Sequence, residues 1–300
     1  MRAVDLFAGA GGFSEGARAA GVSVVWAANH WRAAVDCHAA NHPTTTHACQ
    51  DLQQANWEQV PAHDILLASP CCQGHSRARG TDRPHHDAAR ATAWAVVSCA
   101  EVHRPRFVVV ENVPEFAQWV LYPAWTEAMK ALGYSLSADI HDAADYGVPQ
   151  NRRRLFVVGV RGGRARWIRA PHRAHVPAAQ IIDWEAGAWS PVAEKVAATR
   201  ARIAAGRAEF GPRFVAPYYG SGSGLTGRSL DRPLGTVTTR DRWALVDGDR
   251  LRMLTAEEYR AAMGFPPSYQ LPASATLAKH LLGNAVCPPV AAEIIRQLAA

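Results

Sequence analysis

The sequence predicts an α/β protein with a doubly wound, mostly parallel sheet and a small second domain. Three observations support this fold class. Short apolar stretches alternate with helical patterns as far as residue 160, which is typical of a parallel sheet with crossover helices. The first stretch runs into the glycine turn Gly9-Ala-Gly-Gly12 and then a helix, a layout that brings the backbone close to a nucleotide-like ligand. After residue 162 the alternation stops.

The elements of the predicted sheet follow in chain order. The expected strands cover residues 2–8, 22–28, 64–68, 107–110, 135–140 and 155–160. The expected helices cover residues 14–20, 32–40, 87–103 and 123–132, the last of them ended by Gly133. The run Phe-Val-Val-Val at 107–110 predicts a central strand that is buried on both faces.

The second half of the chain has a different composition and hydrophobic pattern. Residues 161–230 show little strand patterning and are rich in arginine and alanine. Two short apolar segments follow at 234–238 and 243–246, then a helix at 255–263 with Thr255 as its cap, and a terminal helix at 286–298. We therefore expect a main domain of residues 1–160, completed by a C-terminal helix within 280–300, and a small second domain of residues 161–279.

Composition limits the class of protein. With 48% hydrophobic residues in 300 and no apolar run near the roughly 20 residues of a membrane span, a globular cytoplasmic protein without a signal peptide or membrane contact is expected. Six scattered cysteines without a C-x-x-C pair predict neither a disulfide framework nor a metal site. The net charge of +6 permits a nucleic-acid partner without establishing one.

A cysteine loop follows the expected strand at 64–68 and is the first candidate for chemistry. The loop reads Ser69-Pro-Cys-Cys-Gln-Gly-His-Ser76. A thiol at the carboxyl end of a strand lies where α/β folds place their active sites, which favours a nucleophile. The alternative is a pair of small buried residues, because free cysteine is among the most buried residue types.

Two further strand ends carry groups that would complement a thiol. Glu111 ends one strand, and Arg152 and Arg154 precede another. A thiolate at Cys72 could add to an electron-poor heterocycle, with Glu111 as the proton donor to a ring nitrogen and the arginines as donors to a carbonyl or phosphate. Arginines nearby would also favour the thiolate, since free cysteine has a pKa of about 8.5. Each group has a structural alternative, because Glu111 could cap a turn and the arginines could line a solvated edge.

Taken together, these segments resemble the cytosine-5 DNA methyltransferases. Six motifs occur in the family's order: Asp5-Leu-Phe-Ala-Gly-Ala-Gly-Gly-Phe-Ser14, the cysteine loop with Cys72 at the nucleophile position, Glu111-Asn-Val, Gln150-Asn-Arg-Arg-Arg154, Arg232-Pro-Leu-Gly-Thr236 and Gly283-Asn-Ala-Val286. The resemblance covers nearly the whole chain. It implies a Rossmann-like fold of the S-adenosylmethionine-dependent methyltransferase type, with the second domain as a target-recognition domain.

The resemblance also implies a mechanism. A cytosine is flipped out of double-stranded DNA, at a cost of a few kcal/mol. Cys72 adds to ring carbon 6, Glu111 protonates ring nitrogen 3, and Arg154 with Arg152 holds the base carbonyl and the backbone. Carbon 5 then takes a methyl group from S-adenosylmethionine, and loss of its proton releases Cys72. A monomer is expected, with a restriction nuclease as its counterpart in a restriction–modification pair.

Residue roles follow from the same resemblance. Trp31 is expected to stack on the cofactor adenine and Asp51 to accept a hydrogen bond from the adenine amino group. The full cofactor set is Phe7, Gly9, Gly11, Gly12, His30, Trp31, Asp51, Asn284 and Val286. The expected substrate-binding set is Gln73, Ser76, Arg77, Arg79, Asn112 and Gln150, with the two arginines on phosphates.

The sequence departs from the family at several places, among them His75, which replaces a common aromatic residue. His30 stands where a ribose-binding Glu is usual, which implies either weaker binding of ordinary S-adenosylmethionine or use of an acidic analogue such as carboxy-S-adenosylmethionine, giving a carboxymethyl product. Cys71 replaces the usual proline. The region before Arg232 leaves about 70 residues for sequence reading, which favours a short target. Two other functions stay open: a tRNA cytosine methyltransferase, and a DNA-binding regulator with an inactive site.

Overall fold

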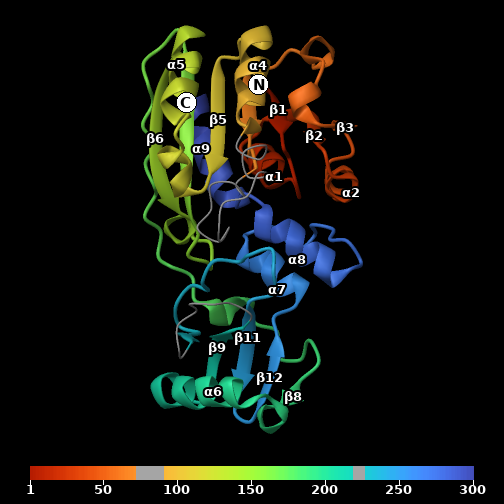
Figure 1. The fold of residues 1–300 in the computed structure, drawn as a ribbon, viewed down its shortest axis with the longest axis vertical. Coiled ribbons are helices and arrows are strands. Elements are labelled where there is room, and N and C mark those ends of the chain that lie inside the picture. The colour runs from red at the N-terminus through yellow and green to blue at the C-terminus, as the bar shows by residue number, and fades with distance from the viewer. Residues whose placement is uncertain (72–90, 219–226) are drawn as a thin grey trace. The chain divides into compact units, whose positions relative to one another are not determined.

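The computed structural model describes residues 1–71, 91–218 and 227–300, and its contacts divide the chain into two compact units (Figure 1). The first unit contains Met1–Asp142, Arg153–Pro171 and Val286–Ala300. The second contains Ala143–Arg152 and His172–Ala285. The boundary expected at residue 160 therefore falls at Pro171, and residues 143–152, before the last strand of the large sheet, belong to the second unit.

The first unit is built on a seven-stranded mixed sheet. Its order is β3-β2-β1-β4-β5-β7-β6. The strands are β1 (Arg2–Leu6), β2 (Ser23–Asn29), β3 (Thr46–Cys49), β4 (Ile65–Ala68), β5 (Phe107–Asn112), β6 (Tyr134–Asp142) and β7 (Arg153–Arg161). The pairings from β3 to β5 are parallel, and β7 is antiparallel to both β5 and β6. The predicted α/β class with a mostly parallel, Rossmann-like sheet is confirmed.

Helices cover this sheet. They are α1 (Gly12–Ala19), α2 (Arg32–Asn41), α4 (Trp94–His103), α5 (Tyr122–Ala131) and α9 (Pro288–Ala299). Strands β4 and β5 are buried at every residue, which explains the unbroken apolar sequence of β4 and of residues 107–110 in β5. Helix α1 packs closely against α9, since a Cβ added at Gly16 would lie 2.5 Å from the Cβ of Ala291. Among the helices that the structure describes, none is long and apolar enough to cross a membrane.

Strand β3 was not predicted from the sequence. Its four residues, Thr46–Cys49, are exposed or half-buried at the edge of the sheet. An edge strand of this kind has no apolar alternation, and only its pairing with β2 reveals it.

The second unit contains a five-stranded antiparallel sheet with the order β10-β9-β11-β12-β8. The strands are β8 (Ser190–Pro191), β9 (Arg213–Pro217), β10 (Arg228–Ser229), β11 (Trp243–Asp247) and β12 (Arg250–Met253). The helices are α6 (Ala197–Phe210), α7 (Ala256–Ala262) and α8 (Ala275–Asn284). Short 3₁₀ turns in the two units cover Leu52–Gln54, Trp57–Gln59, Pro114–Gln118, Ala143–Tyr146, Ala178–Ile181 and Val192–Glu194.

Local predictions for the second unit had mixed outcomes. The segment at 243–246 is a strand, and Thr255 caps α7 with a full capping box together with Glu258. The segment at 234–238 forms no strand, because Leu234 makes only an isolated bridge with Gln150. Helix α6 and strand β9 were missed. The buried residues of α6 are Thr199, Ile203 and Gly206, so the helix presents little apolar pattern.

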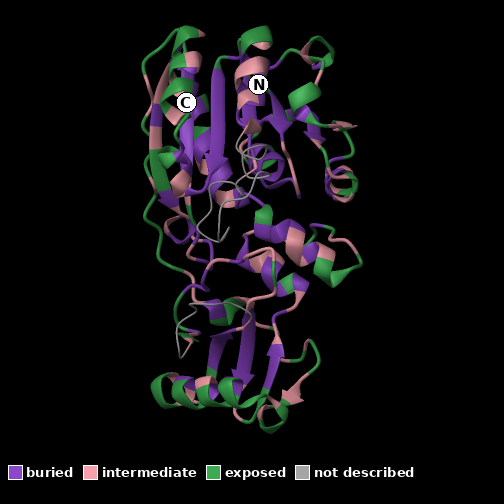
Figure 2. Cartoon of the chain, viewed as in Figure 1, coloured by how far each residue is buried: buried purple, intermediate pink, exposed green. Residues whose placement is uncertain are grey.

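The core of the second unit includes buried residues of its sheet and of α7 and α8. One face of the sheet packs under α6 through Ile203, Phe214, Ala216, Ala244, Val246 and Leu251. Figure 2 shows buried strands in both units, and a largely exposed outer face on α6. Charged side chains also enter the interior of this unit, as Arg252 and Glu258 do.

Candidate active site

The motif residues of the first unit lie at one edge of its sheet. Because β3, β2, β1, β4 and β5 are parallel neighbours, their carboxyl ends meet at the same edge. In that order the ends are followed by Asp51, His30, the glycine turn after Phe7, the cysteine loop and the last residues of β5, Glu111 and Asn112. The chain segments that the sequence singled out for cofactor and chemistry therefore line up along one edge.

The glycine turn after β1 has a backbone that few side chains permit. Gly9 and Gly11 have φ values of 55° and 82°, and Phe7 before them has a φ of 59°. A positive φ favours glycine, and at Phe7 it places strain at the end of the strand. Apart from the Phe7 carbonyl oxygen at 3.8 Å, a Cβ at Gly9 would meet nothing within 4 Å, so this side of the turn is open. A ligand can therefore approach the backbone there.

Gly12 has a different reason to be glycine. A Cβ at this position would lie 2.0 Å from the carbonyl oxygen of Val286, in the segment leading to α9. The absence of a side chain thus allows the start of α1 to touch the last motif of the chain within the first unit. Asn284, two residues earlier, is exposed and belongs to the second unit.

Three expected cofactor residues follow β2 and β3. His30 is exposed, and its carbonyl oxygen accepts a hydrogen bond from the Cys49 thiol at 3.7 Å. Trp31 is half-buried and precedes α2, and its backbone N–H donates to Asn29 Oδ1 at 2.9 Å. Asp51 is exposed and caps a 3₁₀ turn by accepting from the Gln53 N–H. The Asn29 side-chain oxygen is therefore already engaged, while the ring of His30 faces solvent.

The nucleophile position and its loop fall outside the described residues. Cys72, Gln73, Ser76, Arg77 and Arg79 are all in this group. The residues leading to them are well anchored. The N–H of Cys71 donates to Thr92 Oγ1 at 3.1 Å, and the carbonyl of Pro70 accepts from Asn112 Nδ2 at 3.1 Å.

Asn112 and Thr92 therefore hold the start of the cysteine loop. Asn112 is 1% exposed, and its Oδ1 accepts from the Val113 N–H at 2.9 Å, so both ends of its amide contact the protein. We had expected Asn112 to contact substrate, and its contacts instead favour a positioning role. Thr92 was missed, because a lone threonine before a helix carries no signal of a partner 21 residues away.

Glu111 and Arg154 form an ion pair at the end of β5. Arg154 Nε lies 3.1 Å from Glu111 Oε1, and both side chains are largely buried. Strand β7 runs antiparallel to β5, so its first residues reach the edge where β5 ends. The predicted juxtaposition of an acid and an arginine is thus present in the first unit. A guanidinium beside a carboxyl group can also fix the orientation of that group.

Gln150 and Arg152, from the same sequence motif, lie in the second unit. Gln150 is fully buried, and its amide contacts the Ala262 carbonyl at 3.0 Å and the Val237 N–H at 2.7 Å. Arg152 is 3% exposed and donates to three carbonyl oxygens at 2.9–3.0 Å, those of Val237, Gly283 and Ala285. These contacts favour a role in holding the 234–238 segment to the end of α8 over direct contact with a base.

A buried polar chain lies beneath the glycine turn. Ser14 Oγ donates to Asp5 Oδ2 at 2.7 Å, His38 Nε2 lies 2.9 Å from Ser14 Oγ, and His38 Nδ1 lies 2.8 Å from His47 Nε2. Burial raises the pKa of Asp5 to about 7 and holds the pKa of His38 well below its usual range. Because the one hydroxyl proton of Ser14 goes to Asp5, a neutral His38 donates to Ser14 and accepts from His47.

The sequence gave no sign of this chain of contacts, because its members come from four separate elements. It braces β1, α1 and α2 around the open turn. Among residues 1–71, 91–218 and 227–300, no group of three or more His, Cys, Asp or Glu side chains is arranged to hold a metal ion.

Comparison with known proteins identifies the family. The family model for C-5 cytosine-specific DNA methylases matches residues 1–187 and 206–300. The type II methyltransferase M.AgeI of Thalassovita gelatinovora is 30% identical over 187 residues, which are 59% of this chain but only 43% of that protein. The match thus spans less than half of that relative. Type II methyltransferase M.NlaX of Neisseria lactamica is 26% identical over 323 aligned positions, covering 100% of this chain and 96% of that one.

A solved structure supports the fold. The structure of Spodoptera frugiperda DNMT2 superposes with a TM-score of 0.73 over 100% of this chain and 99% of that one, at 18% sequence identity. The resemblance read from six motifs is therefore confirmed by the family model, and the mixed seven-stranded sheet matches the fold of these methyltransferases. The chain belongs to the C-5 cytosine-specific DNA methylase family.

Proposed function

We propose that this protein transfers a methyl group from S-adenosylmethionine to carbon 5 of a flipped cytosine in double-stranded DNA. The observation that carries the proposal is the order of the motif residues along one sheet edge, with Glu111 and Arg154 paired at its end. Membership of the family supports the reaction class. The net charge of +6 suits a polyanionic substrate.

Each residue has a chemical task in this proposal. The Cys72 thiolate adds to carbon 6 of the cytosine, while Glu111 gives a proton to ring nitrogen 3, so that the electron pair of the ring reaches carbon 5. After transfer, a base removes the carbon 5 proton, and the carbon–sulfur bond breaks to return the Cys72 thiolate. Arg154 orients Glu111 through their ion pair. Asn112 and Thr92 fix the backbone just before Cys72.

The residues present fit the cofactor. S-adenosylmethionine supplies an activated methyl group when bound. The open backbone at Gly9 would accept the cofactor's amino-acid part, Trp31 would stack on the adenine and Asp51 would accept from its amino group. His30 lies exposed between them in the order of strand ends, where the ribose hydroxyls are expected. This set requires no metal.

The decisive experiment is expression in a bacterial host that lacks cytosine methylation. The masses of nucleosides from digested DNA and from tRNA are then measured by mass spectrometry. Deoxycytidine carrying one extra methyl group is expected, and a Cys72→Ser variant should give none. Modification of tRNA alone would show that the substrate assignment is wrong, and modification of neither nucleic acid in several hosts would support an inactive DNA-binding regulator.

A second candidate product rests on His30. An imidazole at the ribose-binding position removes a negative charge and adds a donor, and the side chain is exposed to a ligand at this edge. A cofactor with an added carboxylate, such as carboxy-S-adenosylmethionine, would be tolerated there, and deoxycytidine would gain a carboxymethyl group. His30→Glu should abolish that preference. If the choice of cofactor is unchanged in this variant, the remaining explanation for the effect of His30 is weaker binding of ordinary S-adenosylmethionine.

A further inference from the structure

A pocket in the second unit is lined by arginines that have no acidic partner. Its volume is about 380 Å³, and its walls include Arg228, Arg242, Thr238 and Trp243. In the part of the chain that the structure describes, neither Arg228 nor Arg242 forms an ion pair with a carboxylate. The guanidinium of Arg228 lies 5.9 Å from the centre of the Trp243 ring. Two cations thus face one cavity without a built-in counter-ion.

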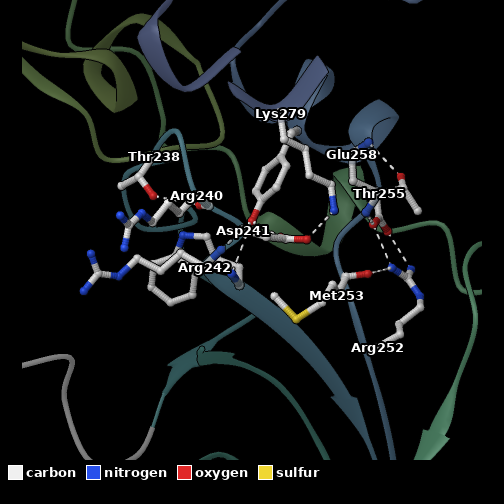
Figure 3. A network of polar contacts seen from close by, with 11 residues as sticks. Thr238, Arg240, Asp241, Arg242, Arg252, Met253, Thr255, Glu258 and Lys279 are labelled. Atoms are coloured by element: carbon white, nitrogen blue, oxygen red, sulfur yellow. Dashed lines mark hydrogen bonds and ion pairs between the residues drawn. The ribbon is translucent and has the colours of Figure 1, made fainter. Parts of the chain in front are cut away.

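The nearest acid in the sequence is held away from these arginines. Asp241 Oδ2 accepts from Lys279 Nζ at 2.5 Å, and Asp241 Oδ1 accepts from the hydroxyl of Tyr259 at 3.0 Å. Figure 3 shows the carboxylate of Asp241 turned toward Lys279, while the side chains of Arg240 and Arg242 extend the other way.

Tyr259 fixes the backbone of the same segment. Its hydroxyl accepts from the N–H groups of Arg242 and Trp243, each at 3.2 Å, while it donates its one proton to Asp241. Burial raises the pKa of Tyr259, so the phenol keeps that proton. One donor and two acceptor sites are all that a phenol hydroxyl offers, and all three are used here.

The wall of the pocket is rigid as well. A Cβ at Gly235 would lie 2.3 Å from Cζ2 of Trp243, so only glycine allows the indole to sit flat against this turn. The indole N–H donates to the Thr236 carbonyl at 3.3 Å. The shape of the pocket is therefore set before any ligand arrives.

We infer that this pocket binds one phosphodiester group of the substrate through Arg228 and Arg242, and that Asp241, Tyr259 and Lys279 are positioning residues that fix the backbone at Arg242 and Trp243. Guanidinium groups bind phosphate oxygens through paired hydrogen bonds, and backbone phosphate contacts set the register of a protein on nucleic acid. The inference rests on the proposed function in one respect: the substrate is a nucleic acid.

The test measures equilibrium binding of the full-length protein to a cytosine-containing duplex across a series of salt concentrations. Arg228→Gln and Arg242→Gln should each weaken binding and should each reduce the salt slope by about 0.9, the value for one lost phosphate contact. Arg200→Gln, an exposed arginine on α6, is the control with the same charge change and should leave the slope unchanged. Unchanged slopes in both pocket variants would overturn the inference.

Asp241→Asn separates positioning from simple charge. Removing a negative charge near a polyanion should tighten binding if only net charge matters. Loss of the contacts that Asp241 makes with Lys279 and Tyr259 should instead weaken binding, by about tenfold, because Arg242 is no longer held in place. Tyr259→Phe keeps the charge and the ring and should weaken binding several-fold. Tighter or unchanged binding by Asp241→Asn in a folded protein would refute the positioning role.

Turnover on the same duplex distinguishes this inference from the proposed function. The Arg242→Gln variant should raise KM for DNA while kcat at saturating DNA stays near that of the unmodified protein. If the protein transfers no methyl group but the pocket variants still lose affinity, the pocket stands and the proposed reaction fails. Competition by inorganic phosphate at constant ionic strength shows the other source of the ligand: displacement of the duplex at millimolar phosphate would indicate a free-phosphate site instead.

Discussion

In the first unit, strand β4 and residues 107–110 of β5 are apolar and buried along their whole length, whereas strand β12 of the second unit carries a buried ion pair to the start of α7. Arg252 and Glu258 form a bidentate pair at 2.7 and 2.8 Å, with side-chain exposures of 1% and 2%. Arg252 also donates to the Asp183 carbonyl, and Glu258 accepts from the N–H groups of Asp183 and Thr255.

The two structures depend on different kinds of interaction. A sheet of valine, leucine and isoleucine is stabilised by burial that many apolar substitutions would preserve. A small antiparallel sheet with a buried ion pair depends on particular partners, because an unpaired buried charge is costly. Strand β4 should therefore respond to lost volume, and the Arg252–Glu258 pair to a lost partner.

The largest expected effect is on the buried pair of the second unit. Glu258→Gln should lower the free energy of unfolding of the second unit by about 4 kcal/mol, because Arg252 is left charged and unpaired in the interior. Urea unfolding followed by hydrogen exchange and mass spectrometry resolves the two units. Glu257→Gln, at the exposed neighbouring position, should change little. Equal effects from the two substitutions would contradict the role of the pair.

Loss of volume in the first unit comes next. Leu67→Ala in β4 should lower the free energy of unfolding of the first unit by about 3 kcal/mol, since Leu67 is 0% exposed and leaves a cavity. The same hydrogen-exchange experiment measures it. Val120→Ala is the control, because Val120 is 84% exposed. Destabilisation confined to the second unit would show that the units are not independent in the way proposed here.

Acidification should destabilise the first unit before the second. Burial lowers the pKa of His42 and His63 to about 4 and holds that of His38 well below its usual range, so the unfolded chain binds protons below pH 6.5 that the folded unit does not. Asp5, with its pKa raised to about 7, acts in the opposite sense, because only the folded state keeps its proton between about pH 4 and 7. The four histidines, with His47 shifted in the same direction, outweigh the one acid, so the first unit loses stability as the pH falls from about 6.5 toward 5.

The second unit should hold its stability over that range. Hydrogen bonds from Arg213 and Arg250 lower the pKa of Asp247, so its contribution is lost only at still lower pH. Urea titrations at pH 7.0, 6.0 and 5.0 measure the slope for each unit. His42→Gln combined with His63→Gln should flatten the slope of the first unit, and an unaltered slope would contradict the assignment.

The smallest effect concerns a helix cap in the second unit. Thr255→Ala removes the side chain that accepts from the Glu258 N–H and should cost about 1 kcal/mol. Ser274→Ala removes the exposed cap of α8, whose hydrogen bond is longer at 3.3 Å, and should cost less. Thermal melting compares the two. A larger loss for Ser274→Ala would mean that the capping box adds nothing.

Much of the first unit could be predicted from its sequence. The strands around 65–68 and 107–110 are continuous apolar runs, and a parallel sheet buries such runs on both faces. Once those strands are placed, Glu111 and the cysteine loop must share an edge. Strand β3 could not be predicted, since its polar edge residues carry no alternation.

The second unit could be predicted only in part. Thr255 allowed the start of helix α7 to be predicted, because a capping side chain contacts the backbone only three residues further along the chain. The pocket arginines gave no such signal. The backbone of Arg242 is held by Tyr259, and its neighbour Asp241 by Lys279, both of which are far along the chain. Long-range hydrogen bonds leave no periodic trace in a sequence.

The motif at 150–154 separates what the sequence indicates from what folding determines. The sequence singled out Gln150, Arg152 and Arg154 as candidate site residues and placed an acid, Glu111, at the end of a central strand. Only the tertiary structure decided that Arg154 pairs with Glu111, while Gln150 and Arg152 are buried among carbonyl groups of the second unit. The physical reason is that identical guanidinium groups take their roles from the partners that folding brings to them, and those partners here come from 43, 85 and 131 residues away.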